Sequence, residues 1–309
     1  AAGEVASALT VETFQDAAGE ISAAVGRYAA HPEWSTRNEV LELLDEVCQR
    51  ASARVYDEAE AAGREGMTTT LVVVVVGGGA AFLGHVGDSR AYLVRDGLIR
   101  QLTEDHSMVN ELVRTGQMTY DEARRSRYRS VITRAIGLYP SVQADVMSIE
   151  ILPGDRLVLN SDGLSDPVGL DLIEELACQD DVDTSTGRLI DAALDAGGPD
   201  NITVVMVEPE ATPQTEAARA RAQVMSELFL FHGLPFHARL RVSRICKELF
   251  FEPGQHVVQE GSKGDAMYVI VQGELVVTRA GVELARLVAG EHFGELGLLE
   301  DQQRSASVT

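Results

Sequence analysis

The sequence predicts an α+β protein of two domains, and three observations lead to this prediction. Apolar residues at helical spacing dominate the first 62 residues. Strands joined by tight turns then follow, in place of the regular strand–helix alternation of a parallel α/β sheet. After a polar segment with two prolines at 208–215, short strands separated by glycine turns indicate a small β-roll.

Two long helices are expected first. Residues 4–28 and 37–62 carry apolar residues at helical spacing, which Val40, Leu44 and Val47 illustrate.

Strands follow the helices. TTTLVVVVV (68–76) is a continuous β-branched run, typical of a strand covered on both faces. Three glycines turn the chain into a second strand at 80–86. Strands at 91–94 and 98–102 flank Arg95-Asp96-Gly97, and the Asp-Gly pair predicts a hairpin turn.

The rest of the first domain mixes both kinds of element. The expected elements are short helices within 107–135, strands at 146–151 and 157–160, helices near 170–177 and 185–196, and a strand at 202–207. We place the first domain at 1–208, a linker and helix at 209–225, with helical pattern over 216–230, and the second domain at 226–309.

Composition excludes several classes of protein. The net charge of −22 would repel a phosphate backbone, so nucleic acid is not expected as a partner. The longest strongly apolar run, 71–76, is far too short to span a membrane, and residues 1–20 do not resemble a signal peptide. Three widely spaced cysteines without a CxxC motif indicate reduced thiols and a cytoplasmic protein.

Three aspartates follow predicted strands beside small residues: Asp88 in GHVGDSRAY, Asp162 in LVLNSDGLSD and Asp200 in GGPDNIT. Strand ends can direct such carboxylates into a shared space, and glycine allows close backbone approach. Carboxylates with no nearby histidine or cysteine favour Mg²⁺ or Mn²⁺. Taken singly, each aspartate is better explained as an ordinary turn residue.

Seven short sequence blocks outweigh the turn explanation, because they occur in the order found in one family. Together they resemble the metal-dependent Ser/Thr protein phosphatase family, type 2C, over residues 1–208. The blocks are GEVAS (3–7), GMTTTLV (66–72), GHVGDSRAYL (84–93), LTEDHS (102–107), ITRAIG (132–137), LVLNSDGLSD (157–166) and GGPDNITVV (197–205).

The resemblance implies a β-sandwich flanked by helices and a two-metal centre with Asp162 and Asp200 among its ligands. Asp88 matches a residue that contributes to a third metal in bacterial members, with Asp162 shared. Residues 107–130 match a flap near the active site. Two Mn²⁺ or Mg²⁺ ions would neutralise the phosphate of a phosphoserine or phosphothreonine on a protein and activate water, so no nucleophilic side chain is needed.

Further residues of the matched blocks are expected to have structural roles. His85 and His106 lie in matched blocks, and His106 is expected to form structural hydrogen bonds, although it could assist catalysis. Arg90 and Arg134 are expected to brace acidic turns more than to bind phosphate.

The second domain contains a candidate anion site in FGELGLLEDQQRSASV (293–308). Gly294 clears space, backbone N–H groups at Glu295-Leu296 can face a phosphate, and Arg304 can add a charged contact. Together with FEPGQHVVQEGSKGDAMYVIVQGEL (251–275), this segment resembles cyclic-nucleotide-binding domains over residues 226–309.

That resemblance implies ligand contacts from the glycine-rich turn and from the arginine that follows it. The implied residues are Gly294, Glu295, Leu296, Arg304 and Ser305. The hydroxyl of Ser305 suits cAMP or cGMP, so both nucleotides stay open. Met267, Tyr268 and Phe293 have strand-like spacing and are expected to lie in the core.

Taken together, the sequence indicates a signalling phosphatase whose activity is controlled by cAMP or cGMP. The alternative is a phosphatase-like scaffold that has lost catalysis and senses the nucleotide. Retention of Asp88, Asp162 and Asp200 favours the enzyme.

The resemblance also predicts that residues 1–309 alone hydrolyse phosphate esters poorly. Family members carry an Asp-Gly-rich segment that bridges both metals, a phosphate-binding arginine and a histidine general acid ahead of the GEVAS block, and the closing strand and lid helix of the nucleotide domain follow the arginine motif. Hydrolysis of a phosphoserine peptide with Mn²⁺ measures this directly. Turnover by residues 1–309 equal to that of a longer chain carrying the Asp-Gly segment would contradict the expectation.

Overall fold

The computed structural model describes residues 2–64, 66–213, 215, 218–219, 246–247, 249–295 and 303–309, without the side chain of Arg124. The chain divides into two compact units, Ala1–Thr215 and Glu216–Thr309, and each is described by itself. Most of the predicted helix at 216–230 lies outside the described residues.

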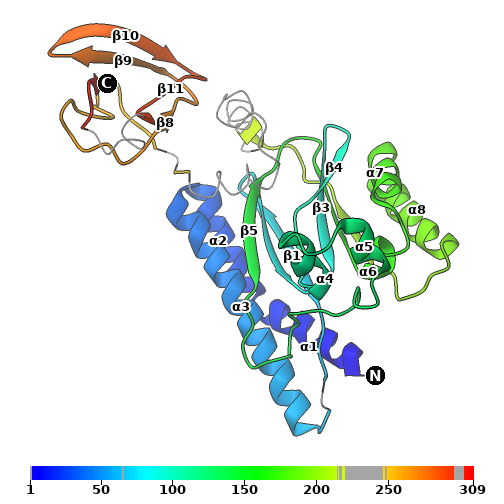
Figure 1. Ribbon diagram of the computed structural model, residues 1–309. Helices are drawn as coiled ribbons and strands as arrows, with labels where there is room; N and C mark the ends of the chain where they lie inside the picture. The colour runs from blue at the N-terminus through cyan, green and yellow to red at the C-terminus, as the bar shows by residue number, and fades with distance from the viewer. Residues whose placement is uncertain are drawn as a thin grey trace. The chain divides into compact units, whose positions relative to one another are not determined.

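Three helices form one layer of the first unit: α1 (Ala2–Asp16), α2 (Ala18–Ala30) and α3 (Trp34–Ala61) (Figure 1). The helical pattern expected over 4–28 is confirmed, but the chain forms two helices there, because it bends at Ala17. Thr10 and Thr13 each donate a hydroxyl hydrogen bond to the carbonyl four residues earlier, at 2.8 Å, an arrangement that bends helices. Among the described residues, no helix is long and apolar enough to cross a membrane.

The first sheet has the order β1-β2-β5, built from β1 (Leu71–Gly77), β2 (Ala80–Val86) and β5 (Asp145–Glu150), all antiparallel. β2 is the central strand and every residue in it is buried. This explains its uninterrupted small and apolar sequence, since both of its faces are covered.

The second sheet has the order β4-β3-β6-β7. Its strands are β3 (Arg90–Arg95), β4 (Leu98–Gln101), β6 (Arg156–Asn160) and β7 (Val204–Val207). The predicted hairpin turn between β3 and β4 is confirmed, because Asp96 and Gly97 both have positive φ, 53° and 72°. Two successive positive φ angles define the turn that Asp-Gly favours.

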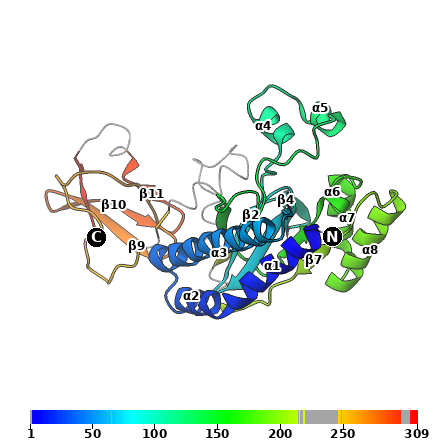
Figure 2. The same cartoon turned by 90° about the horizontal axis from the view of Figure 1, so that it is seen from below.

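Helices cover the outer sides of the two sheets (Figures 1 and 2). Helix α3 packs on β2 and β5, whereas α7 (Leu170–Gln179) and α8 (Val182–Asp195) pack on the second sheet. Leu44 and Phe82 are buried on the first side, and Val158 and Leu189 on the second. The predicted sandwich flanked by helices is confirmed.

One segment leaves the sandwich between β4 and β5. It carries α4 (Met108–Arg114) and α5 (Tyr120–Arg125), which project away from the sheets in Figure 2. Both ends are fixed at one point, where Ser107 pairs with Ile132 and the Met108 amide donates to the Val131 carbonyl at 2.9 Å. We call residues 107–131 the flap.

The second unit contains short antiparallel strands, as the glycine spacing predicted. They are β8 (Tyr268–Val269), β9 (Glu274–Arg279), β10 (Val282–Val288), β11 (His292–Phe293) and β12 (Ser307–Val308). They form one sheet in the order β10-β9-β12 and a second, two-stranded sheet, β11-β8. This arrangement brings residues 303–309 back beside the earlier strands.

Candidate functional site

Asp162 and Asp200 lie on adjacent loops at one end of the second sheet. Asp162 begins the short helix α6 (Asp162–Ser165) directly after β6, and Asp200 precedes β7, the neighbouring strand. Ser161 joins the two loops, because its hydroxyl accepts a hydrogen bond from the Thr203 amide and donates one to the Asn201 carbonyl, each at 3.1 Å.

Gly163 is required for this close approach. A Cβ atom on Gly163 would lie 2.3 Å from the carbonyl oxygen of Asn201, a contact that real side chains do not make. The glycine in Ser-Asp-Gly therefore permits one backbone to rest on the other, next to both aspartates.

Asp88 reaches the same region from the other sheet, in the loop between β2 and β3. Gly87 precedes it with a φ of +111°, and a Cβ there would lie 2.5 Å from Cγ2 of Thr70. A side chain at position 87 would be both strained and blocked. Glycine thus directs Asp88 toward the second sheet.

Burial and neighbouring charges raise the pKa values of two of these carboxyls, Asp88 and Asp162. Burial raises the pKa of Asp88 to about 6, with further contributions from the charges of Asp162 and Asp105. Burial also raises the pKa of Asp162, and Asp166 and Asp200 add to the shift. Because every donor is a carboxylate oxygen, this cluster fits hard divalent cations such as Mg²⁺ or Mn²⁺. Sequence reasoning missed Asp105 and Asp166, which have no separate motif.

Asp88, Asp162 and Asp200 do not converge as tightly as the ligands of a single ion. Among the described residues, the only set of three potential ligands whose atoms lie within 4.8 Å of one another is His85, His106 and Asp145.

The compact set around His106 is explained by hydrogen bonds without a metal. The Gly87 amide donates to Nδ1 of His106 at 3.1 Å, so Nδ1 carries no proton. A neutral ring must then hold its proton on Nε2, which lies 3.3 Å from a carboxylate oxygen of Asp145. Metal binding at Nε2 would need the proton on Nδ1 and would break the Gly87 hydrogen bond.

His106 instead fixes the loop that carries Asp88. Its backbone amide donates to the Gly87 carbonyl at 2.7 Å while its ring accepts from the Gly87 amide. Both polar groups of Gly87 are thus held by one residue. The structural role expected for His106 is confirmed by these bonds.

His85 is a buried neutral histidine beside it. Burial lowers its pKa to about 4, and the neighbouring His106 ring, 4.7 Å away between centroids, lowers it further. The backbone of Ser89 has a small opposing effect on the pKa, yet neither ring nitrogen has a hydrogen bond of ordinary geometry. The ring packs on β2 beside His106.

The two arginines brace acidic residues, as expected. Arg90 binds both carboxylate oxygens of Asp105, through Nε at 2.9 Å and Nη2 at 2.6 Å. Arg134 donates to Asp145 at 2.9 Å, and the pKa of Asp145 falls to about 2 through its bonds to His106 and Arg134. Such bidentate and charge-assisted pairs hold the loops in place.

In the second unit, the structure brings Gly294 and Arg304 together. The guanidinium of Arg304, which is buried, donates to the Gly294 carbonyl at 3.0 Å and to the Ala266 carbonyl at 2.6 Å. A Cβ on Gly294 would lie 2.5 Å from Nη1 of Arg304, and its φ is +88°. Glycine is therefore needed for the arginine to cross this turn.

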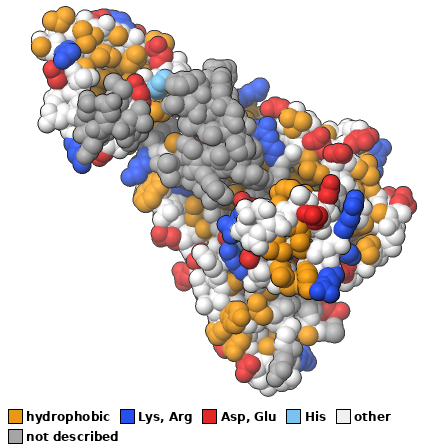
Figure 3. Space-filling view, viewed as in Figure 1, with side chains coloured by type: hydrophobic (Ala, Val, Ile, Leu, Met, Phe, Trp, Pro, Cys, Tyr) orange, Lys and Arg blue, Asp and Glu red, His pale blue; other side chains and the backbone are white. Residues whose placement is uncertain are grey.

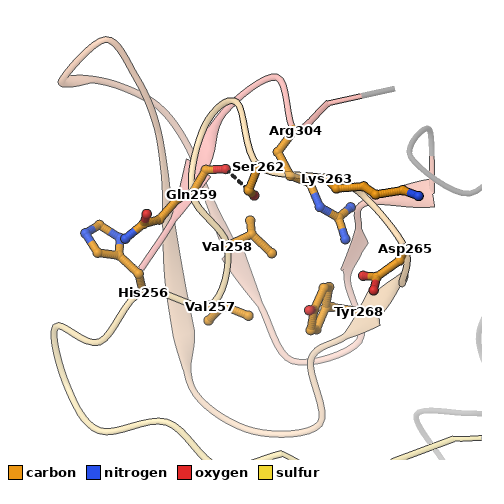
Figure 4. Close-up of a pocket in the computed structure, with 9 residues that line it drawn as sticks. All are labelled: His256, Val257, Val258, Gln259, Ser262, Lys263, Asp265, Tyr268 and Arg304. Atoms are coloured by element: carbon orange, nitrogen blue, oxygen red, sulfur yellow. Dashed lines mark hydrogen bonds between the residues drawn. The ribbon is translucent and has the colours of Figure 1, made fainter. Parts of the chain in front are cut away.

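The structure does not bring the other residues expected to contact the nucleotide together in the same way. Glu295 is partly buried, Ser305 is exposed, and Leu296 lies outside the described residues. Beside Arg304 is a cavity of about 270 Å³, where Figure 4 shows the guanidinium pointing toward Tyr268 and Asp265. Tyr268 stacks on Phe293 with ring centroids 5.0 Å apart and also lines this cavity.

Two family profiles match the chain. The profile described as Protein phosphatase 2C matches residues 1–196, and the profile described as Cyclic nucleotide-binding domain matches residues 248–309. The two matches fall on different units of the structure.

Similar proteins are bacterial phosphatases. A putative protein phosphatase 2C-type of Streptococcus pyogenes is 36% identical over 210 residues, covering 68% of this chain and 81% of that protein. The crystal structure of the Mycobacterium tuberculosis serine/threonine phosphatase PstP/Ppp has a TM-score of 0.59 and 36% identity, covering 68% of this chain and 83% of that one. Another structure, of the PstP catalytic domain with two manganese ions, has a TM-score of 0.55 and 35% identity, covering 66% and 80%.

We predict that Gly163→Ala separates the two loops. The new methyl group displaces the Asn201 carbonyl, so the free energy of unfolding should fall by about 1–3 kcal/mol and Mn²⁺ should bind more weakly. Denaturant unfolding and calorimetric titration with Mn²⁺ measure the two effects. Gly187→Ala, on α8 with open space around it, is the matched control and should be neutral or stabilising. Unchanged Mn²⁺ affinity in Gly163→Ala would refute the role given to this contact.

Proposed function

The chain belongs to the protein phosphatase 2C family, and we propose that its first unit removes phosphate from phosphoserine and phosphothreonine on proteins with divalent ions held by Asp88, Asp162 and Asp200. The observation that supports this most is the group of carboxylates on neighbouring loops, in which burial and the charges of neighbouring aspartates raise the pKa values of Asp88 and Asp162. Such crowding disfavours the metal-free ionised state and is relieved by bound cations.

The chain's own residues hold this site in shape. Asp162 and Asp200 would bind the ions from adjacent loops that Ser161 joins by hydrogen bonds. Asp88 would bind from the loop that His106 holds through its hydrogen bond with Gly87. Bound Mn²⁺ or Mg²⁺ would neutralise the phosphate and lower the pKa of a coordinated water. Arg90 holds Asp105 through two hydrogen bonds, which keeps that carboxylate turned toward the arginine and leaves the metal ligands separate.

We further propose that the second unit binds cAMP or cGMP and that binding alters phosphatase activity. The Arg304 guanidinium lies against Gly294 and lines a cavity, which supports an anion site there. Arginine suits a phosphate because its planar donors pair with two oxygens. Regulation requires that the nucleotide bind two states of the protein with different affinity.

The rival proposal is a catalytically inactive scaffold that senses the nucleotide. It differs from the enzyme in needing no metal at the acidic cluster. The raised pKa values of Asp88 and Asp162, each caused by burial and by neighbouring carboxylates, favour the enzyme, because such carboxylate crowding is costly without a cation.

We predict that Asp88→Asn stabilises the metal-free protein at pH 7. The pKa of Asp88 is about 6 in the folded protein and 3.8 in the unfolded chain, so between these pH values the folded state binds more protons than the unfolded state. The stability of the protein therefore falls as pH rises through that interval. The gain should be on the order of 1 kcal/mol at pH 7 after solvent screening, and should vanish near pH 4. Thermal unfolding from pH 4 to 7.5 with EDTA measures it.

The same variant should gain less stability than the wild type when Mn²⁺ is added, because a ligand is lost. Asp191→Asn, exposed on α8, is the control and should keep the wild-type response to both pH and Mn²⁺. Equal stabilisation of Asp88→Asn and wild type by Mn²⁺ would argue against Asp88 as a ligand.

For the second unit, Arg304→Gln should weaken cAMP or cGMP binding at least tenfold, since a charge-assisted phosphate contact is lost. Calorimetric titration with each nucleotide measures this, and exposed Arg279→Gln is the control. Circular dichroism checks that the variant is folded. Equal phosphatase activity of the complete protein with and without either nucleotide would reject the regulatory proposal.

A further inference from the structure

The flap ends in a strongly basic stretch that the phosphatase chemistry does not use. Residues 124–134, RRSRYRSVITR, hold five arginines and no acidic residue, in a chain with 48 acidic and 26 basic residues. We call this stretch the arginine segment. Figure 3 shows basic and acidic side chains together on the face over α5, α6 and α7.

Most arginines of the first unit are paired with a carboxylate. Described examples are Arg27 with Glu39, Arg50 with Glu20, Arg54 with Glu12, Arg95 with Asp155 and Arg156 with Glu208. By contrast, exposed Arg125 and Arg127 have no carboxylate partner among the described residues. In so acidic a chain, cations left without internal partners are available to an external anion.

Arg127 and Tyr128 make a preformed contact surface. The Arg127 guanidinium lies over the Tyr128 ring, 4.6 Å from its centroid, and donates to the Tyr128 hydroxyl. Both side chains are exposed. Stacking on the ring reduces the freedom of the arginine before any ligand binds, and leaves other guanidinium donors for a carboxylate or phosphate.

The arginine segment adjoins the acidic cluster. Nε of Arg129 lies 4.0 Å from a carboxylate oxygen of Asp166, both partly solvated. Asp166 in turn raises the pKa of Asp162 and Asp88. A peptide advances about 3.3 Å per extended residue, so a phosphoresidue at the cluster would place its near neighbours beside Arg129, and residues further along could reach Arg127 and Arg125.

We infer that Arg125, Arg127 and Arg129 bind acidic groups that flank the phosphoresidue, and that the preferred substrates are phosphopeptides with further aspartate, glutamate or phosphorylated residues. The inference rests on the proposed phosphatase function. The chemistry is the pairing of guanidinium with carboxylate or phosphate, at surface sites where several weak pairs act together. The flap contributes selectivity, while the carboxylate cluster and its cations contribute the reaction.

Binding of fluorescent peptides to the full chain with Mn²⁺, followed by anisotropy, tests this. The peptides carry a non-hydrolysable phosphonate analogue of phosphoserine, so turnover does not interfere. Flanking residues are glutamate in one, a second phosphonate analogue of phosphoserine in another and glutamine in a third, and a fourth keeps the glutamates without any phosphonate. We expect both anionic flanks to bind about tenfold tighter than the glutamine flank, with the advantage falling as salt rises.

Arg125→Gln/Arg127→Gln should reduce this advantage to less than twofold and leave affinity for the glutamine-flanked peptide unchanged. Arg37→Gln/Arg64→Gln, with the same change of net charge in and just after α3, is the matched control and should keep the preference. If the wild type binds all flanks alike, if both double variants behave alike, or if a single-stranded oligonucleotide competes as well as the anionic peptides, the inference is wrong.

The fourth peptide separates the two proposals. If the phosphonate adds no affinity in Mn²⁺ while the preference for glutamate flanks persists, the metal-centre proposal fails and the arginine segment stands. If the phosphonate adds affinity and the anionic flanking residues do not, the proposal for the arginine segment is wrong and the metal-centre proposal is supported.

Discussion

Like-charge crowding at the ends of the strands is the constraint on which the first unit depends. The charges of Asp166 and Asp200 add to the raised pKa of Asp162, and the charges of Asp162 and Asp166 add to the raised pKa of Asp88, in a chain whose net charge is already −22. Ionised carboxylates repel one another, so the surrounding structure must hold these aspartates close together. Two packed sheets with helices outside provide that rigidity, since the loops leave from strands that cannot move independently.

The loops are held by contacts between backbones more than by long side chains. Gly163 rests on Asn201, Gly87 rests on Thr70, and His106 binds both polar groups of Gly87. Each contact tolerates little displacement, because it depends on the missing Cβ or on a ring nitrogen of fixed protonation. The cluster that looks most like a metal site by spacing, around His106, is thus part of the support for the carboxylates.

Much of this could be predicted from local sequence, and the exceptions have physical reasons. Asp96-Gly97 specifies its hairpin because only a few residues accept two positive φ angles. The bend at Ala17 was missed because Thr10 and Thr13 keep the apolar spacing of a helix while their hydroxyls bend it. Asp145 pairs with His106, and Gly163 contacts Asn201, so each acts through a residue far away in sequence. No local pattern encodes such partners.

The arginine segment answers a difficulty that the overall charge creates. A phosphopeptide is an anion, and a chain of net charge −22 repels it at long range. At physiological ionic strength charges are screened beyond about 8 Å, so a local basic surface can outweigh the distant acidic excess. Arg129 beside Asp166 places that surface at the edge of the cluster. Cations at the carboxylates and arginines on the flap then act on different parts of one substrate: the first on the phosphate, the second on the residues next to it.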